Sequence, residues 1–271
     1  MTLSYHNANR QLQSTFIGKG GKMDFVLSQQ SDGISTLRLN RGKVNALNDC
    51  VVDQLRAHLQ RLESDPEVRS IILTGFGRFF SFGFDIPELI SFSKEQFVGY
   101  LENFTDLYRY LFLYPKPVVA ALNGHAIAAG CMLALACDYR VMVIGKARIS
   151  LNEIGFGSSV FAGSTEMLRF WVGSGNATTI LYSGAMYAAE EAKSLGLVHD
   201  VTTEENHMIV ARQAASDLAS KHSPAFASIK SLLRRPIADL MLRRERESIT
   251  EFAEIWYSEA TWANLQNIKI R

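Results

Sequence analysis

The residues of this chain best suited to chemistry are one carboxylate and two glycine-containing turns. Glu153 comes at the end of an expected strand, between two apolar residues and just before Gly155 and Gly157. Apolar and glycine neighbours favour partial burial of the carboxyl group, and burial raises the pKa of a carboxylic acid. The alternative is that Glu153 is a surface residue, as lone carboxylates at strand ends usually are.

The two turns offer backbone N–H groups. Small residues fill positions 126–130, which we expect to open a helix with almost no polar side chains, and Gly83 comes just before a second helix. The first N–H groups of a helix have no intrahelical acceptor and favour an oxyanion or a phosphate. A tightly packed core helix and a hydrophobic turn over the core explain the same residues equally well.

Two backbone donors and one base together suit the removal of a proton next to a carbonyl group. The donors would bind the carbonyl oxygen as it gains charge, and Glu153 would take the proton. From these residues alone, this reaction is a hypothesis.

The elements that must position these residues follow an α/β order, in which strand patterns alternate with helix patterns. Strands are expected over residues 34–40, 70–74, 117–121, 139–144, 146–151 and 197–201. Asn48, Asp85 and Ser93 are expected to cap helices. Further helices are expected over 174–183, 188–195 and 203–220, with two or three more over 223–271, the last carrying Phe252, Trp256 and Trp262.

Composition narrows the class of protein. With 271 residues, 47% hydrophobic content and a net charge of +1, the chain can form one large domain and shows no basic surface for nucleic acid. The arginine groups at 234–235 and 243–246 are expected on a solvated helix face. Three cysteines without metal-ligand spacing indicate a reducing compartment, so we expect a soluble intracellular protein, cytoplasmic in a bacterium, with the organelle left open. No apolar run has transmembrane length.

A series of motifs, in one order, makes the chain resemble the crotonase superfamily of enoyl-CoA hydratases and isomerases. The motifs are residues 37–41, 45–48, 71–75, 80–86, 117–130, 136–141 and 190–198. The resemblance covers about residues 34–201. The Leu-Asn-Glu sequence that ends at Glu153 looks like that of Δ3-Δ2-enoyl-CoA isomerases.

The resemblance implies an α/β fold: a crotonase-like spiral of ββα units over residues 23–202. Residues 1–22 contain no Asp or Glu, and we expect them to form a flexible tail, with a targeting segment as the alternative. A helical region over 203–271 would cover the core or form trimer contacts. Acyl-CoA substrates, homotrimers or dimers of trimers, and the absence of metal and redox cofactors are also implied.

The resemblance also assigns site residues by position. Phe84 and Ala129 would supply the two oxyanion N–H groups, and Glu153 the catalytic carboxylate. Arg41 or Lys43 could contact a CoA phosphate, although such loop residues are more often only solvated. The residues expected to contact CoA or the acyl group are Val44, Ala46, Phe82, Gly83, Asp85, Ile86, Gly130 and Met132.

One departure from the family pattern decides the expected reaction. Hydratases of this superfamily use two glutamates; the first falls at Met132, which cannot shuttle a proton, and the second at Glu153. One carboxylate is enough to take the C2 proton of a 3-enoyl-CoA and return it to C4 of the dienolate. We therefore expect an isomerase of fatty acid metabolism that forms 2-enoyl-CoA.

Other readings stay open. The same oxyanion hole could serve thioester hydrolysis or decarboxylation, and a chain of this kind could bind acyl-CoA without catalysis. Hydration would need a further acid, such as Glu166 or Glu102, at the site. Acyl chain length, pathway, the choice between trimer and hexamer, and residual hydratase activity are not given by the sequence.

Overall fold

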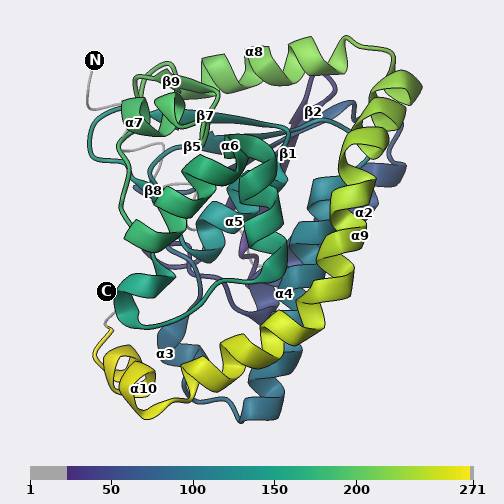
Figure 1. Cartoon of the computed structure of the whole chain (residues 1–271). Helices are drawn as coiled ribbons and strands as arrows, with labels where there is room; N and C mark the ends of the chain where they lie inside the picture. The colour runs from purple at the N-terminus through teal and green to yellow at the C-terminus, as the bar shows by residue number, and fades with distance from the viewer. Residues whose placement is uncertain (1–22, 269–271) are drawn as a thin grey trace.

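Two sheets organise the fold (Figure 1). The computed structural model describes residues 23–268, so the expected tail at 1–22 lies outside the described residues. Within them, the larger sheet has six strands, in the order β1 (Val26–Ser31), β2 (Ile34–Leu39), β3 (Ser70–Gly75), β5 (Val118–Leu122), β7 (Tyr139–Val143) and β9 (Asp200–Thr202). The smaller sheet has three, β4 (Phe79–Ser81), β6 (His125–Ile127) and β8 (Ile149–Ser150).

The strands from β3 to β8 form three consecutive pairs, and each pair contributes one strand to each sheet. The consecutive pairs β3 and β4, β5 and β6, and β7 and β8 all put their first strand in the larger sheet and their second in the smaller one. β1 runs antiparallel to β2, and the other neighbouring strands are parallel. This is the predicted spiral of ββα units, and the α/β class is confirmed.

Helices follow the strand pairs and wrap around both sheets. They are α2 (Asp49–Ser64), α3 (Ile86–Leu89), α4 (Lys94–Leu113), α5 (Ala129–Ala136), α6 (Ala162–Ser183), α7 (Ala189–Ser194), α8 (His207–Ala219), α9 (Ser223–Trp256) and α10 (Glu259–Gln266), with a 3₁₀ turn, η1 (Glu153–Phe156). The predicted caps are confirmed: the side chains of Asn48, Asp85 and Ser93 each accept an N–H from the first turn of their helix.

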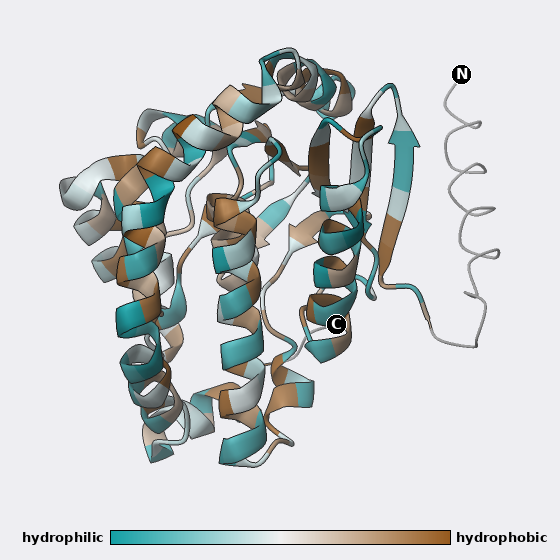
Figure 2. Ribbon diagram, turned by 90° about the vertical axis from the view of Figure 1, so that its right-hand side faces the viewer, coloured by the Kyte–Doolittle hydropathy of each residue, from teal (hydrophilic) through white to brown (hydrophobic). Residues whose placement is uncertain are grey.

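The core forms where the strands and the apolar helix α5 meet. All residues of β3, β5 and α5 are buried, and Figure 2 shows apolar colouring concentrated on the inner strands, with polar and apolar positions alternating on the outer helices. α9 runs alongside α4 down one side of the molecule (Figure 1). α9 also packs against α6.

Three expected boundaries were wrong. Residues 125–127 form β6 rather than the start of a helix, because Ala126 and Ile127 pair with β8 in the smaller sheet. The strand expected over 146–151 shortens to 149–150, and the strand expected over 197–201 forms at 200–202. The helix expected over 174–183 is confirmed as the second half of α6, which follows a kink at Gly173, where φ is +73°.

Two expectations about the C-terminal region were also wrong. Phe252 and Trp256 belong to α9, and only Trp262 lies on the last helix. Arg234 is not on a solvated face: its side chain is 4% exposed and pairs with Asp138 at 2.9 Å. The reason is that α9 passes the end of α5, whose carbonyl groups lack intrahelical donors, and Arg234 donates to the carbonyl oxygen of Ala136 at 3.2 Å.

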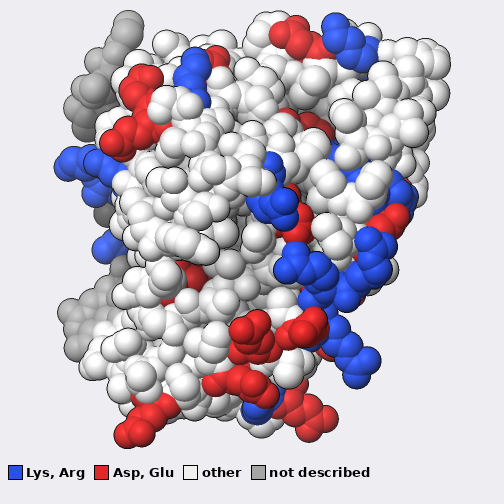
Figure 3. All heavy atoms as spheres, in the orientation of Figure 1, with Lys and Arg blue, Asp and Glu red and all other residues white. Residues whose placement is uncertain are grey.

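The surface carries both signs of charge. On the face shown in Figure 3, acidic side chains gather over the lower part of the molecule and basic side chains at the middle right, with some of the opposite sign in each area. Within residues 23–268, none of the helices combines the length and the apolar character needed to cross a membrane.

Candidate active site

The turn after β4 lies directly against the first residue of α5. Gly83 has a φ of +95°, and a Cβ built on it would stand 3.3 Å from the amide nitrogen of Ala129 and 3.0 Å from the carbonyl oxygen of Ile127. Leu47 fixes this turn from the other side, because its N–H donates to the Gly83 carbonyl oxygen at 2.8 Å. The backbone angle therefore favours glycine at position 83, and a side chain there would also be tightly packed.

The two backbone donors expected from the sequence are both free. Among the described residues, neither the N–H of Phe84 nor the N–H of Ala129 has a hydrogen-bond acceptor. Ala129 is the first residue of α5, and the first N–H that closes a helical bond is that of Met132, which donates to the Ala128 carbonyl oxygen at 3.0 Å. Two unpaired donors thus come together where the helix dipole is positive.

An unusual backbone conformation precedes Ala129. Ala128 has φ of +50° and ψ of −120°, which residues other than glycine rarely adopt. Its N–H donates to the Ser150 carbonyl oxygen at 2.8 Å, so the strained residue is held between β8 and α5. Backbone strain of this kind, on the order of 1–3 kcal/mol, persists where the surrounding structure imposes it.

Glu153 begins η1, after Leu151 and Asn152, which follow β8. Glu153 is only 3% exposed. Neither of its carboxylate oxygens has a hydrogen-bond partner among residues 23–268. Burial raises the pKa of Glu153 to about 8. Its backbone is well held, because its carbonyl oxygen accepts the N–H of Ser158 at 3.0 Å. The predicted burial and raised pKa are confirmed.

A cavity of about 230 Å³ brings these groups together. It is walled by the turn after β4, the start of α5, η1 and the end of α9. The lining residues are Phe82, Phe84, Ile86, Ile127, Ala128, Ala129, Met132, Asn152, Glu153, Phe156, Phe161, Phe252, Trp256 and Ile268. Apart from Glu153 and Asn152, this wall is apolar or aromatic, which suits a hydrocarbon chain.

Six of the predicted site residues line the cavity, and five do not. Those that line it are Phe82, Phe84, Ile86, Ala129, Met132 and Glu153. Val44 and Ala46 are buried in the loop that supports the turn, and the Val44 carbonyl oxygen accepts the N–H of Phe82 at 3.0 Å. Gly83 and Gly130 allow two backbone segments, the turn after β4 and the start of α5, to pack closely. A Cβ on Gly130 would stand 2.4 Å from the Ser81 carbonyl oxygen.

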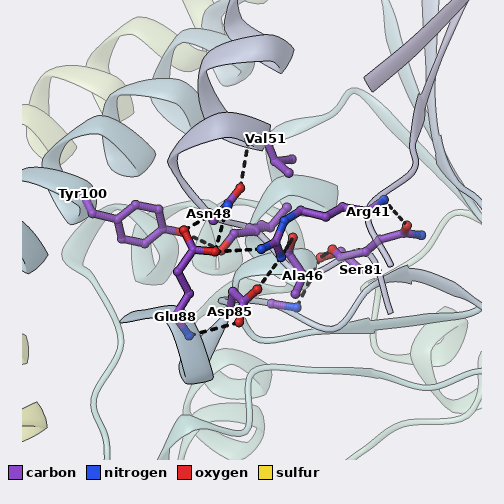
Figure 4. Close-up of polar contacts among 11 residues, drawn as sticks. Arg41, Ala46, Asn48, Val51, Ser81, Asp85, Glu88 and Tyr100 are labelled. Carbon is purple, nitrogen blue, oxygen red and sulfur yellow. Dashed lines mark hydrogen bonds and ion pairs between the residues drawn. The ribbon is translucent and has the colours of Figure 1, made fainter. Parts of the chain in front are cut away.

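Asp85 is the fifth predicted site residue that does not line the cavity. It belongs to a charged network below the turn after β4 (Figure 4). Arg41 pairs with Asp85 and donates to Glu88 at 2.7 Å, and Glu88 also accepts from the side-chain amide of Asn48 at 2.9 Å. The guanidinium of Arg41 is thus engaged inside the protein. In this loop, the exposed Lys43 is the basic side chain available to a CoA phosphate.

Sequence reasoning missed much of the cavity wall. The missed residues are Ile127, Ala128, Asn152, Phe156, Phe161, Phe252, Trp256 and Ile268. One signal in the sequence was the cluster of aromatic residues near the C-terminus. It predicted that the last helices cover the core or a subunit contact, but it did not indicate that they line a cavity. The alternative acids do not reach the cavity: Glu166 pairs with Arg244 at 2.6 Å, and Glu102 is exposed.

Comparison with known proteins places the chain in a family. The sequence profile of the family described as enoyl-CoA hydratase/isomerase matches residues 29–259. The chain is 36% identical over 215 residues to 2,3-dehydroadipyl-CoA hydratase of Escherichia coli (strain K12), covering 78% of this chain and 82% of that protein. It is 28% identical over 233 residues to enoyl-CoA delta isomerase 1 of Mus musculus, a mitochondrial protein, covering 85% and 81%.

A solved structure agrees with this assignment to the family. The crystal structure of human mitochondrial delta3-delta2-enoyl-CoA isomerase superimposes with a TM-score of 0.85 and 26% identity, covering 90% of this chain and 96% of that one.

Proposed function

Because the chain belongs to the enoyl-CoA hydratase/isomerase family of the crotonase superfamily, we propose that it is a Δ3-Δ2-enoyl-CoA isomerase. The observation that supports this most strongly is the wall of the cavity. Within the described residues, Glu153 is the single titratable side chain that lines it. By the family resemblance, Met132 stands where a hydratase would carry its other glutamate. One carboxylate can move a proton within a substrate, whereas the hydration chemistry of this superfamily uses two.

The proposed reaction begins with the thioester oxygen at the N–H groups of Phe84 and Ala129. Glu153 removes a proton from C2 of the 3-enoyl-CoA, and the electron pair moves into the thioester to form a dienolate. The two N–H groups stabilise the charge on oxygen, each by roughly 2.7–4 kcal/mol in the transition state. They are fixed in the folded backbone, so no reorganisation is needed when the charge develops.

The second half of the reaction returns the same proton. Protonated Glu153 donates it to C4, the double bond forms between C2 and C3, and the carboxylate is regenerated. The pKa of about 8 suits both steps, because a carboxyl group of that pKa is a stronger base than an ordinary glutamate and can still release its proton. The proposed reaction needs no metal or redox cofactor.

Hydration is the second candidate, because a relative as similar as the Escherichia coli protein is named a hydratase. It would require water to be activated by Glu153 without a second acid in the cavity. Hydrolysis, decarboxylation and acyl-CoA binding without turnover use the same backbone donors, but no feature of the wall favours them. We also propose, from the family resemblance, that the chain forms a homotrimer or a dimer of trimers.

Product analysis tests the proposal. The protein is incubated separately with 3-hexenoyl-CoA and 2-hexenoyl-CoA, and products are separated by chromatography and weighed by mass spectrometry. We expect conversion of the first ester into the second with no change in mass. A product heavier by one water, formed at a comparable rate, would overturn the isomerase in favour of a hydratase. Binding without conversion of either ester would favour a binding protein.

A further inference from the structure

Within the described part of the chain, no hydrogen bond from a neighbouring side chain holds the carboxylate of Glu153. The residue is buried, and the wall of the cavity around it is apolar or aromatic apart from Asn152. The direction in which the carboxylate points is therefore set by packing and by the backbone of η1, the turn that Glu153 begins. Whatever fixes this turn also fixes the proposed acid/base.

One peptide group links the backbone of Glu153 to the C-terminal helix α10. The N–H of Ser158, in the peptide bond that joins Gly157 to Ser158, donates to the Glu153 carbonyl oxygen at 3.0 Å. The carbonyl oxygen of the same peptide group, that of Gly157, accepts the hydroxyl of Thr261 at 2.6 Å. Because a peptide group is planar and rigid, these two hydrogen bonds orient it together. Thr261 is thus joined to Glu153 through one rigid unit.

The contact between η1 and α10 is close. Gly157 has a φ of +82°, which favours glycine, and a Cβ built on it would stand 3.3 Å from the Thr261 Oγ1. Thr261 is 3% exposed, so its hydroxyl is shielded from solvent. A second hydrogen bond joins the two elements, because the side-chain amide of Asn264 donates to the Phe156 carbonyl oxygen at 3.2 Å. The first bond is the shorter one and the one whose donor residue is buried.

The helix that carries Thr261 is itself anchored to the body of the protein. The hydroxyl of Tyr257, just before α10, donates to the Phe92 carbonyl oxygen at 3.0 Å. The ring of Trp262 stacks on the ring of Tyr257 at a centroid distance of 5.1 Å, and Leu265 is fully buried. α10 can therefore act as a fixed support for η1.

We propose that Thr261 is a positioning residue of the isomerase: its hydroxyl orients the peptide group after Gly157 and so aims the Glu153 carboxylate at C2 and C4 of the substrate. This rests on the proposed function. A general base must lie within hydrogen-bond reach of the proton that it removes, and a displacement of about 1 Å can lower the rate about 10²-fold. Thr261 is not among the residues that line the cavity, so its loss should slow proton transfer without weakening binding of the ester.

The test compares two variants of this residue. Thr261→Val removes the hydroxyl and keeps the shape of the side chain, whereas Thr261→Ser keeps the hydroxyl. Steady-state kinetics with 3-hexenoyl-CoA gives kcat and KM. We expect Thr261→Val to lower kcat about 10- to 100-fold while KM changes by less than about twofold, because only the transition state needs the exact position of the base. Thr261→Ser should keep most of the wild-type kcat.

Thr105→Val is the matched control. Thr105 is 4% exposed, its hydroxyl donates to the Glu102 carbonyl oxygen of its own helix at 3.1 Å, and it does not line the cavity. Its replacement should leave kcat unchanged. A wild-type kcat in Thr261→Val, an equal fall in Thr261→Ser, or an equal fall in Thr105→Val would each show that the Thr261 hydroxyl does not position the base, while the isomerase stands.

Hydrogen exchange gives a readout that does not depend on turnover. Amide exchange over residues 153–158, followed by mass spectrometry, should be faster in Thr261→Val than in the wild type and unchanged in Thr105→Val. Unchanged exchange in Thr261→Val would overturn the proposal, because the effect would not pass through η1. If the wild type fails to convert the ester, the proposed function has failed, and exchange alone decides whether Thr261 fixes this turn.

Discussion

Gly83 and Ala129 approach so closely that even a Cβ on Gly83 would require its neighbours to shift by a few tenths of an ångström. A Cβ on Gly83 would stand 3.3 Å from the Ala129 amide nitrogen and 3.2 Å from the Ala128 Cβ. The two proposed oxyanion donors therefore come from segments whose separation is set by backbone packing. This spacing is a property of the fold and does not depend on the identity of the side chain at position 84.

Gly83→Ala should lower kcat by about 10²–10³, the loss typical of removing one oxyanion donor. The added methyl group would push the turn away from α5 and misplace the Phe84 N–H. Steady-state kinetics with a 3-enoyl-CoA measures the effect. Gly77→Ala is the control, because Gly77 also has positive φ, +73°, but nothing lies within 4 Å of its Cβ position. Equal losses in both variants would mean that backbone strain, not the oxyanion donor, is responsible.

Ala128→Gly should stabilise the protein by about 1 kcal/mol and raise Tm by roughly 2–4 °C. The φ of +50° at Ala128 is unfavourable for alanine and acceptable for glycine. Thermal unfolding of the two proteins gives the difference. Ala126→Gly is the control, because it makes the same change at a buried position of the strand β6. The Tm of this variant should fall. A lower Tm for Ala128→Gly would show that the strain is not released by glycine.

The rate of isomerisation should rise with pH. Glu153 acts as a base only when ionised, and burial raises its pKa to about 8. Below that pH, kcat/KM should therefore increase about tenfold per pH unit, and it should level off above it. A pH profile with a midpoint near 4.5, or no pH dependence between 6 and 9, would contradict the assignment.

Glu245→Gln is the control for this pH profile. Burial raises the pKa of Glu245 to about 7, but its carboxylate accepts the Tyr108 hydroxyl at 2.6 Å outside the cavity. Its replacement should leave the midpoint of the profile where it was.

Met132→Glu should introduce hydration of 2-enoyl-CoA. Met132 is 1% exposed and lines the cavity with Glu153, so a carboxyl group there would give the site its second acid. We expect the product with one added water to rise from a negligible amount to a measurable one by mass spectrometry. Met132→Gln has a similar shape without the acid and should not hydrate. Hydration by the glutamine variant would show that shape alone had blocked it.

Features set by neighbouring residues could be predicted from the sequence. The caps at Asn48 and Ser93 depend on a side chain and an N–H within one helical turn, and both formed as expected. The burial of Glu153 followed from its apolar and glycine neighbours. Ala126 and Ile127 of the short strand β6 were mistaken for the start of a helix because they begin an apolar run that leads into α5, and only pairing with distant strands makes them extended.

Features set by distant contacts could not be predicted. Trp256 lines the same cavity as Phe84, although the two residues are far apart in the sequence. Their proximity depends on the path of α9 across the molecule. Arg234 was expected in solvent because its neighbours in sequence are charged, yet the end of α5 buries it. The polar edge strand β1 was missed, since Val26 is its only fully buried residue and no alternation marks it.

The central claim is that one carboxylate performs both proton transfers, and Glu153→Gln tests it most directly. Glutamine keeps the size and polarity of the side chain but cannot exchange the proton. Turnover of 3-hexenoyl-CoA and the Kd of the same ester, measured by calorimetry, are compared in the wild type, in Glu153→Gln and in Glu166→Gln, which alters a carboxylate outside the cavity. We predict that turnover is lost only in Glu153→Gln, with binding retained. Isomerisation by Glu153→Gln at the wild-type rate would contradict the account.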